Sequence, residues 1–321
     1  MTVFHNLEAA AGGFGPCALA IGNFDGVHVG HQALLRATTA YARVHQLVPA
    51  VLTFDPHPTA VVAPHRRPQM ICTVEDRVRL LSAAGAEKIL VLPFTEQLAR
   101  MSPREFVERI LVDGLGTRAL FVGQNFRFGY RQAGTPEVLA QLGAELNFEA
   151  QFLAPVVLRG RVVSSSAIRK QLAASQVSCA ARFLNRWFSM RGTIVSGHGV
   201  GAKQTVPTLN LRPTPGLVCP RGVFVTETSD IDSDRVWPSI TNVGIRPTFG
   251  GDEMTIETYL LGPLEGESPQ AIEVRFQHFL REERKFASPE ELKAQIMRDV
   301  QRSQIFRARW KKLQKSVPSI Y

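Results

Sequence analysis

Two histidines three residues apart, His28 and His31, stand where a predicted strand gives way to a predicted helix. The apolar run over residues 17–21 is typical of a buried strand, and residues 32–37 have the pattern of an amphipathic helix. A spacing of three places both imidazoles on one face of the first helical turn. Gly26 lets a ligand approach the backbone, and the free N–H groups and dipole of a helix N-terminus favour an anion. The segment therefore predicts a phosphate site with two histidines directed at it.

Two simpler interpretations of this segment exist. A solvated loop, or half of a metal site, would also place two histidines near a turn. Zinc sites take three or four ligands, and nothing close to His28 and His31 in the sequence completes such a set. The strand–loop–helix context favours the phosphate site.

Length and composition narrow the class of protein. A chain of 321 residues with 45% hydrophobic residues suggests two domains with real cores. It has no apolar run of about 18 residues, so we expect no membrane partner, and residues 1–6 lack a secretory pattern. Four cysteines without paired spacing favour a cytoplasmic protein. The net charge of +9 suits nucleic acid or polyphosphate substrates; we expect no nucleic-acid partner, because the basic run at 307–312 more simply solvates a terminal helix. No signal for an oligomeric state is present.

The N-terminal half alternates between strand-like and helix-like patterns. Strand-like runs occur at residues 17–24, 48–54, 88–94, 119–123 and 148–158. Helical patterns lie between them at residues 31–45, 75–84, 103–115 and 135–146. This alternation predicts an α/β fold, a doubly wound parallel sheet that binds a nucleotide and carries helices on both faces.

Polar segments follow three of these predicted strands directly. They are residues 22–31, 55–58 and 124–129. Parallel strands end at the same edge of their sheet, and ligands bind beyond that edge. We therefore expect the three segments to converge on one site.

A fourth segment carries three serines, Ser164, Ser165 and Ser166, followed by Arg169. Serines before a helical pattern are typical of an N-cap. Their hydroxyls, the free N–H groups and the guanidinium could together hold a triphosphate. Taken alone, a plain helix cap is the simpler interpretation.

The C-terminal half has a different pattern. Short strand-like runs occur at residues 188–195, 222–228, 236–243, 255–261 and 271–280. They predict a small antiparallel β-barrel, followed by a C-terminal helix that begins with Ser288, Pro289 and a capping-box Glu291. We place the domains at residues 1–182 and 183–321.

Three parts of the barrel could carry chemistry. The glycine-rich residues 197–203 could wrap phosphates, or could be an ordinary loop. Thr208 and Asn210 are two apart on an extended chain, so they point the same way and could share one Mg²⁺. Glu257 lies within a predicted strand and is either a base or an ordinary exposed residue.

These segments together resemble the prokaryotic bifunctional riboflavin kinase/FAD synthetase family, in the same order over nearly the whole chain. The matching segments are residues 22–32, 54–58, 122–129 and 164–169 in the first half, and 207–210, 242–249, Glu257 and 281–286 in the second. The resemblance implies a nucleotidyltransferase-like first domain and a flavokinase barrel. It also implies two reactions: ATP phosphorylates riboflavin to FMN, and a second ATP adenylylates FMN to FAD with release of pyrophosphate.

In the first domain, the resemblance implies that His28 and His31 stabilise charge on the α-phosphate of ATP. The other implied ATP contacts are Asn23, Gly26, Ser164, Ser165, Ser166 and Arg169. The implied flavin or nucleotide pocket comprises Asn125, Phe126 and Phe128, although either phenylalanine could belong to the core.

In the barrel, the resemblance implies that Glu257 takes the proton of the ribityl hydroxyl as a general base. Thr208 and Asn210 would hold Mg²⁺ with ATP, and Gly201 and Lys203 would contact ATP. FMN and FAD would be substrates and products, with no prosthetic group.

The barrel departs from the family pattern Gly-Arg-x-Leu-Gly-Phe-Pro-Thr-Ala-Asn. Ala202 replaces the arginine, with Lys203 beside it as a substitute; Thr205 replaces the second glycine, and Leu209 the alanine. Because the proline, threonine and asparagine remain, we expect an active kinase. In the first domain Ser166 replaces a threonine and keeps the hydroxyl.

Three rival functions remain. Pantetheine-phosphate or cytidylyl transferases share the two-histidine motif but lack the barrel residues. A nucleic-acid module would fit the charge but leaves the phosphate motifs unexplained. A relative with one activity would keep the barrel only as a scaffold.

Overall fold

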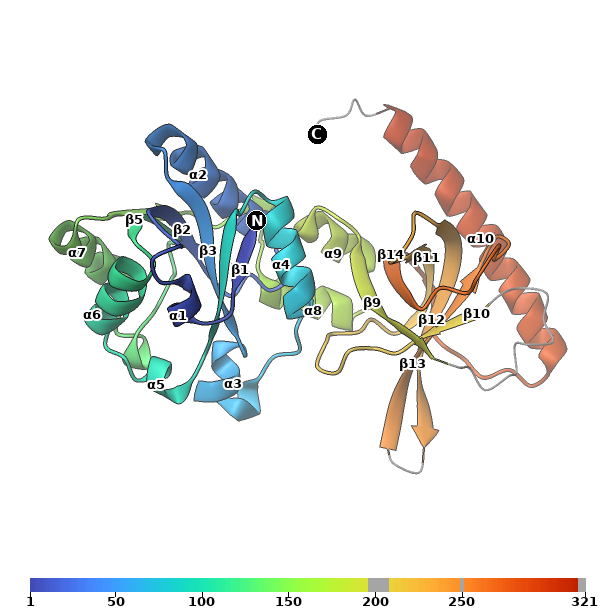
Figure 1. The fold of residues 1–321 in the computed structure, drawn as a ribbon. Coiled ribbons are helices and arrows are strands. Elements are labelled where there is room, and N and C mark those ends of the chain that lie inside the picture. The colour runs from blue at the N-terminus through green and yellow to red at the C-terminus, as the bar shows by residue number, and fades with distance from the viewer. Residues whose placement is uncertain (196–207, 249–250, 317–321) are drawn as a thin grey trace. The chain divides into compact units, whose positions relative to one another are not determined.

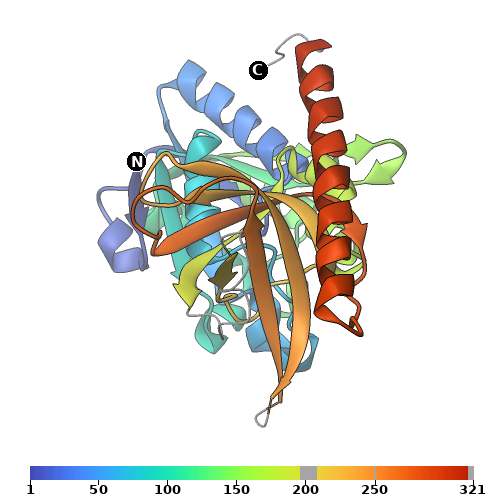
Figure 2. The same ribbon diagram turned by 90° about the vertical axis from the view of Figure 1, so that its right-hand side faces the viewer.

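The computed structural model describes residues 1–195, 208–248 and 251–316. The chain divides into two compact units, Met1–Ile168 and Arg169–Tyr321 (Figures 1 and 2). The domain boundary that we placed after residue 182 stays a prediction, which fragments can test.

The first unit is built on a sheet of six parallel strands in the order β1-β4-β3-β2-β5-β6. Its strands are β1 (Thr2–Phe4), β2 (Cys17–Ile21), β3 (Val48–Asp55), β4 (Lys88–Pro93), β5 (Thr117–Gly123) and β6 (Glu149–Leu153). The predicted parallel sheet is confirmed. The run predicted at 148–158 is broken, because β6 ends and a separate hairpin of β7 (Val157–Leu158) and β8 (Arg161–Val162) follows.

Helices cover both faces of this sheet, as a doubly wound fold requires (Figure 1). The helices are α1 (Leu7–Ala10), α2 (Val29–His45), α3 (Pro58–Val62), η1 (Pro64–Arg66), α4 (Val74–Ala83), α5 (Glu96–Ala99), α6 (Pro103–Glu105), η2 (Phe106–Gly114), η3 (Tyr130–Gln132) and α7 (Pro136–Leu146). Residues of α1, η2 and α7 share one core with the sheet, and residues of α2 and α4 share the other. All five residues of β2 are buried between the two cores, which explains its uninterrupted apolar run.

Strand order reverses at β2, because β3 pairs with one side of it and β5 with the other. At such a switch point the loops after neighbouring strands separate and leave a crevice outside their carboxyl ends. The loops that follow β2 and β5 therefore flank the position where this fold class binds ligands.

The second unit contains a closed antiparallel barrel, in the order β10-β13-β12-β11-β14-β9. Its strands are β9 (Phe188–Val195), β10 (Thr208–Leu211), β11 (Gly222–Asp230), β12 (Val236–Thr248), β13 (Gly251–Leu260) and β14 (Ala271–Arg281). The other helices of the chain are α8 (Ser165–Ala173), α9 (Val177–Leu184) and α10 (Pro289–Ser316). The predicted barrel and C-terminal helix are confirmed.

A ladder of hydroxyl groups is buried within the barrel sheet. Thr226 lies 2.9 Å from Ser239 and 2.7 Å from Thr241, and Thr241 lies 3.0 Å from Thr258, measured between side-chain oxygens. Since side chains alternate across a strand, the residues next to these hydroxyls in sequence, such as Ile240 and Glu257, lie on the opposite face of the sheet.

The capping of α10 differs in one detail from the prediction. Ser288 Oγ accepts from the backbone N–H of Glu291 at 3.2 Å, as expected. The carboxylate of Glu291 accepts from the N–H of Ala287, at 3.1 Å, where the capping box predicts the N–H of Ser288. Both bonds still satisfy donors at the helix start.

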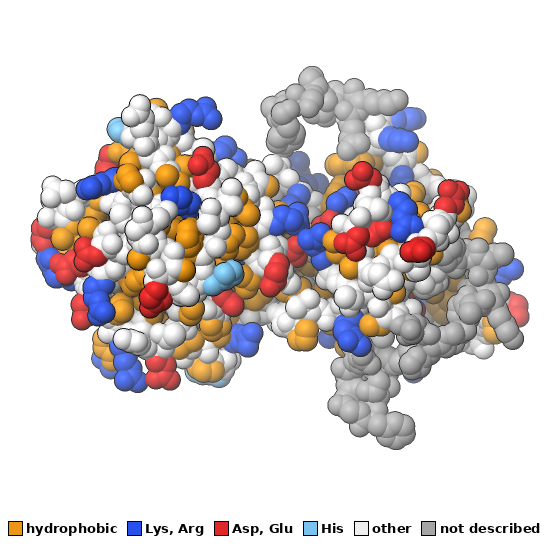
Figure 3. Space-filling model, viewed as in Figure 1, with side chains coloured by type: hydrophobic (Ala, Val, Ile, Leu, Met, Phe, Trp, Pro, Cys, Tyr) orange, Lys and Arg blue, Asp and Glu red, His pale blue; other side chains and the backbone are white. Residues whose placement is uncertain are grey.

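Two further features concern the helices and the surface charges. Within the described residues, no helix is long and apolar enough to cross a bilayer. On the face seen in Figure 3, acidic and basic side chains are interspersed.

Candidate active sites

The loop after β2 turns sharply into α2. Phe24 and Val27 adopt φ of 48° and 38°, and Gly26 adopts 80°. A Cβ added at Gly26 would lie 2.9 Å from the side chain of Ile71, so both conformation and space require glycine there. The buried carboxylate of Asp25 accepts from the backbone N–H of Ile71 at 2.9 Å and fixes the loop from below.

His28 and His31 meet at the start of α2. His28 is the N-cap residue, and its Nδ1 accepts from the backbone N–H of His31 at 3.3 Å. The two rings stack with centroids 3.6 Å apart and planes 15° from parallel. Because Nδ1 of His28 is an acceptor, the neutral ring carries its proton on Nε2 and offers a donor there. The edge of Phe24 supports the His31 ring from a centroid distance of 5.1 Å.

The structure brings a third histidine to this loop. The side-chain amide of Asn23 lies 3.2 Å from His57 Nε2. Nδ1 of His57 accepts from the backbone N–H of Thr59 at 3.2 Å and thereby caps α3. The atom of Asn23 that faces the ring is Nδ2, and whether His57 Nε2 donates or accepts depends on the tautomer of His57. Sequence reasoning placed residues 55–58 at this edge but did not single out His57.

The serine segment begins α8 close to the same loop. Ser165 Oγ donates to the carbonyl of Asp25 at 2.8 Å. Ser164 Oγ accepts from the backbone N–H of Ala167 at 3.2 Å, which is the cap bond that the sequence predicts. Ser166 is exposed, and the half-buried Arg169 follows one turn after Ser165 in the same helix. One serine therefore caps the helix and another attaches it to the loop after β2.

The residues predicted after β5 divide into two groups. Asn125 is exposed. Phe128 is buried in the core and packs on Phe106 with centroids 5.8 Å apart. Phe126 is half-buried and stacks on Phe128 at a centroid distance of 5.5 Å. Phe128 thus belongs to the core, and Phe126 packs against that core while keeping part of its surface exposed.

In the barrel, Glu257 of β13 lies between two asparagines. The register pairs it with Asn210 of β10 on one side and with Asn242 of β12 on the other. Directly paired side chains share a face of the sheet, so the carboxylate is flanked by two amides. Thr208, two residues before Asn210, pairs with Tyr259 on that same face.

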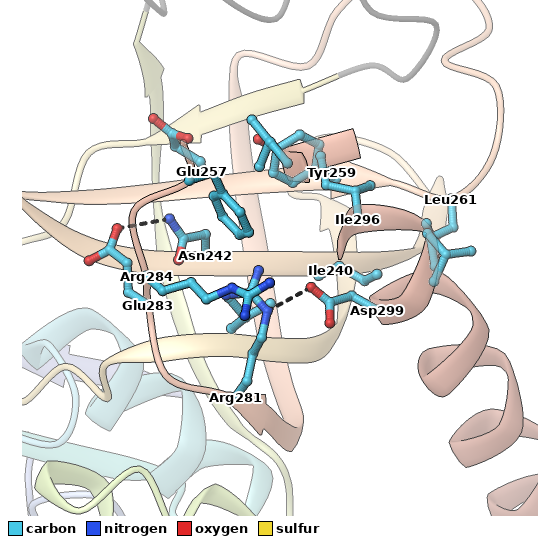
Figure 4. A pocket seen from close by; sticks show the side chains of 14 residues that line it. Ile240, Asn242, Glu257, Tyr259, Leu261, Arg281, Glu283, Arg284, Ile296 and Asp299 are labelled. Carbon is cyan, nitrogen blue, oxygen red and sulfur yellow. Dashed lines mark hydrogen bonds and ion pairs between the residues drawn. The ribbon is translucent and has the colours of Figure 1, made fainter. Parts of the chain in front are cut away.

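Glu257 lies at the rim of a pocket of about 230 Å³ between the barrel and α10 (Figure 4). Its apolar walls include Val223, Ile240, Leu261, Leu292, Ile296 and Val300. Two polar pairs line it: Asn242 Nδ2 donates to Glu283 at 3.2 Å, and Arg281 donates to Asp299 at 2.9 Å. Burial raises the pKa of Tyr259, and the nearby charge of Glu257 raises that pKa further, so this phenol stays neutral.

The donor set near Glu257 fits a hard cation. The hydroxyl oxygen of Thr208 is buried with no hydrogen-bond partner among the described residues, and Asn210, which carries an amide oxygen, lies two residues further along the same face of β10. Oxygen ligands of this kind suit Mg²⁺, which keeps most of its waters and binds phosphates. No cluster of three His, Cys, Asp or Glu side chains suited to a metal occurs in the described part of the chain. Gly201 and Lys203 lie outside the described residues.

A parallel sheet with a polar loop and a helix N-terminus at its switch point, followed by a barrel with a carboxylate at an apolar pocket, defines a two-domain nucleotide-dependent transferase. The family model of FAD synthetase matches residues 14–167, and that of riboflavin kinase matches residues 184–306. The chain belongs to the bifunctional riboflavin kinase/FMN adenylyltransferase family. It phosphorylates riboflavin and adenylylates FMN, both at the expense of ATP.

Curated relatives support this membership over most of the chain. The bifunctional riboflavin kinase/FMN adenylyltransferase of Pseudomonas fluorescens is 35% identical over 92% of this chain and 94% of its own length. The enzyme of the same description from Escherichia coli K12 is 33% identical, over 88% and 90%. A solved structure described as a macrolide-efflux protein from Streptococcus pneumoniae has a TM-score of 0.84 over 94% of this chain and 98% of its own, at 24% identity. That likeness concerns the fold.

Proposed function

We propose that the two reactions occur at the two sites just described, adenylyl transfer at the loop after β2 and phosphorylation at the rim of the barrel pocket. The observation that carries this division is the position of Glu257 between Asn210 and Asn242, at an apolar pocket in the second unit. No histidine lines that pocket, whereas the first unit stacks two at a helix N-terminus. Each unit therefore has the groups for one reaction.

In the first unit, a phosphate oxygen of FMN attacks the α-phosphorus of ATP. The new phosphorus–oxygen bond forms as the bond to the β-phosphate breaks, and pyrophosphate leaves. His28 and His31 stabilise the charge that develops on the α-phosphate, supported by the dipole at the N-terminus of α2, where the two rings stack. No covalent intermediate with the protein is needed.

The remaining groups of the first unit hold the substrates. We assign the ATP phosphates to Asn23, the backbone at Gly26, Ser164, Ser165, Ser166 and Arg169. Because Ser165 already donates to Asp25, its part is to position the loop, while the exposed Ser166 is the serine left to meet phosphate. Asn125 and the half-buried ring of Phe126 line the flavin or nucleotide pocket, with Phe128 behind them.

In the barrel, Glu257 accepts the proton of the terminal ribityl hydroxyl as its oxygen attacks the γ-phosphorus of ATP. The bond between the β–γ bridging oxygen and the γ-phosphorus breaks, and ADP leaves. The apolar walls of the pocket suit the flat isoalloxazine ring of riboflavin, and the polar pairs at its edge suit the polar ribityl chain. Thr208 and Asn210 would hold Mg²⁺, whose charge offsets that of the phosphates when it is bound.

We also propose a cytoplasmic enzyme whose partners are flavins and ATP and which holds neither FMN nor FAD as a prosthetic group. The four cysteines are all free, in keeping with a reducing compartment.

The decisive test follows FMN and FAD over time after mixing riboflavin, ATP and Mg²⁺. The variant His28→Ala should accumulate FMN and make little FAD, and Glu257→Gln should make little FMN but still convert added FMN to FAD. Loss of both activities in either folded variant would contradict two independent sites.

A further inference from the structure

Arg77 is the largest almost wholly buried side chain among the described residues, with 2% of its surface exposed. It comes from α4, and its Nη1 donates to the backbone carbonyl of Phe54 at 2.8 Å and to the hydroxyl of Thr53 at 3.2 Å. Both partners lie near the carboxyl end of β3, next to β2 in the sheet. The guanidinium therefore lies under the edge at which the loop after β2 begins.

The guanidinium of Arg77 has no carboxylate oxygen within ion-pair distance among the described residues. It forms no ion pair there, and its Nε has no hydrogen-bond partner in that part of the chain. The buried carboxylate of Asp25 is bonded instead to the backbone N–H groups of Ile71 and Cys72. A buried cation without a partner is costly, so an arginine here needs a compensating role that a neutral residue would not fill.

A hydrogen-bond relay connects Arg77 to the candidate phosphate site. The hydroxyl of Thr53 accepts a hydrogen bond from Arg77 and donates one to the backbone carbonyl of Asn23 at 3.2 Å. Asn23 in turn contacts His57 through its side chain. The relay thus holds the backbone of Asn23, at the start of the loop after β2, from the neighbouring strand β3.

We propose that Arg77 is a positioning residue of the adenylyl-transfer site, which holds Asn23 through Thr53 and supplies a buried positive charge for the triphosphate and the pyrophosphate product. This inference rests on the proposed function of the loop after β2. A fixed charge in a water-excluded site acts on a polyphosphate more strongly than a surface charge, because solvent does not screen it. A purely structural role would require the hydrogen bonds alone.

The test separates the charge from the hydrogen bonds in the full-length enzyme. Arg77→Met removes both, Arg77→Lys keeps the charge but loses the planar donor fork, and Thr53→Val keeps the charge but breaks the relay at nearly constant volume. Arg100→Met is the control, since Arg100 is an exposed arginine of the same unit that pairs with Glu96. Each variant is assayed for the ATP KM and kcat of FAD formation from FMN, for inhibition by inorganic pyrophosphate, and for FMN formation from riboflavin.

We expect Arg77→Met to raise both the ATP KM and the pyrophosphate inhibition constant by roughly tenfold, the size of one lost interaction with a partly shielded charge. Arg77→Lys should recover most of the pyrophosphate affinity, and Thr53→Val should lower kcat while leaving that affinity within about threefold of wild type. FMN formation should be normal in all of them, which shows that the second unit is folded, and an unchanged circular-dichroism spectrum should show that the first unit is folded as well. Arg100→Met should match wild type in every assay.

Normal ATP and pyrophosphate constants in Arg77→Met, or equal losses in Arg77→Met and Arg77→Lys, would overturn the proposal. If Arg77→Met does not fold, the comparison of Arg77→Lys with Thr53→Val decides: weaker pyrophosphate binding in Thr53→Val than in Arg77→Lys overturns it. His28→Ala distinguishes the two levels of inference. If FAD formation survives His28→Ala, the proposed adenylyl-transfer site is wrong. If His28→Ala loses FAD formation but Arg77→Met keeps normal ATP and pyrophosphate constants, only the role of Arg77 is wrong.

Discussion

Replacing Glu257 with glutamine should stop phosphorylation of riboflavin while leaving the substrate site intact. Glutamine keeps the length and hydrogen-bonding shape of the side chain but cannot accept the ribityl proton. The cross-strand neighbours Asn210 and Asn242 are amides and cannot replace it as a base. Loss of a general base costs about 10²–10⁴ in rate, which corresponds to roughly 3–5 kcal/mol in the activation barrier.

The assay is the initial rate of FMN formation from riboflavin, with riboflavin binding measured by quenching of its fluorescence. Glu283→Gln is the matched control, because this carboxylate lines the same pocket and bonds to Asn242 without lying beside Asn210. Glu283→Gln should lower riboflavin affinity or the rate of FMN formation by no more than about tenfold, the size of one hydrogen bond to a charged group.

Two results would refute this assignment. The first is a Glu257→Gln enzyme that phosphorylates riboflavin within about twofold of the wild-type rate, since that is far below the loss of a general base. The second is a loss in Glu283→Gln as large as that in Glu257→Gln, which would make Glu283 the better candidate for the base.

Three further predictions test the first site, the domain boundary and His278, whose ring stacks on Phe306 of α10. His28→Ala should lower FAD formation from FMN on the order of 10²-fold and leave FMN formation near normal, and a folded variant that loses both would contradict separate sites. Residues 183–321 should fold and make FMN but no FAD. Residues 169–321 should do the same with a higher Tm, because they add the buried Val177 and Ala180 of α9, and equal Tm values would count against this. Burial, and to a lesser degree Arg302, lowers the pKa of His278 below its usual 6.5, so the unfolded chain binds the proton more readily and stability should fall as pH drops below about 6.5. His278→Gln should flatten that fall in tryptophan-monitored unfolding, since all three tryptophans lie in the second unit, while His65→Gln should not.

Sequence patterns predicted most elements of the fold because its central strands are buried runs. The five residues of β2 are all buried, and so is most of β3, which gives runs that no surface element would carry. The sequence did not indicate β1, which has three residues, and it suggested only an extended chain for the four of β10, since such short strands hold by pairing with neighbours. Helix starts were predicted best where a side chain makes the cap, as at Ser164.

The site was less predictable wherever a role depends on distant residues. His57 meets Asn23 only because β2 and β3 are neighbours in the sheet. Arg77 stands in an ordinary amphipathic helix pattern, in which an arginine is usually exposed, so its burial is visible only in three dimensions. For Phe126 and Phe128 the sequence left core and ligand roles open; packing against Phe106 places Phe128 in the core, and the ligand role of Phe126 stays a prediction.

The two sites differ in how their groups are held, and this difference decides which substitutions are informative. In the barrel, strand pairing sets the positions of Asn210, Asn242 and Glu257, so an isosteric change at one leaves the backbone of the others in place. In the first unit, left-handed turns and side-chain caps hold the loop, and His28 is itself the cap of α2. His28→Ala therefore removes a helix cap worth about 1 kcal/mol as well as the imidazole that we propose to be catalytic. His28→Asn, which can still cap the helix, separates the two: a persistent loss of FAD formation would show that the imidazole acts on the substrate, and full recovery would show that it only shapes the loop.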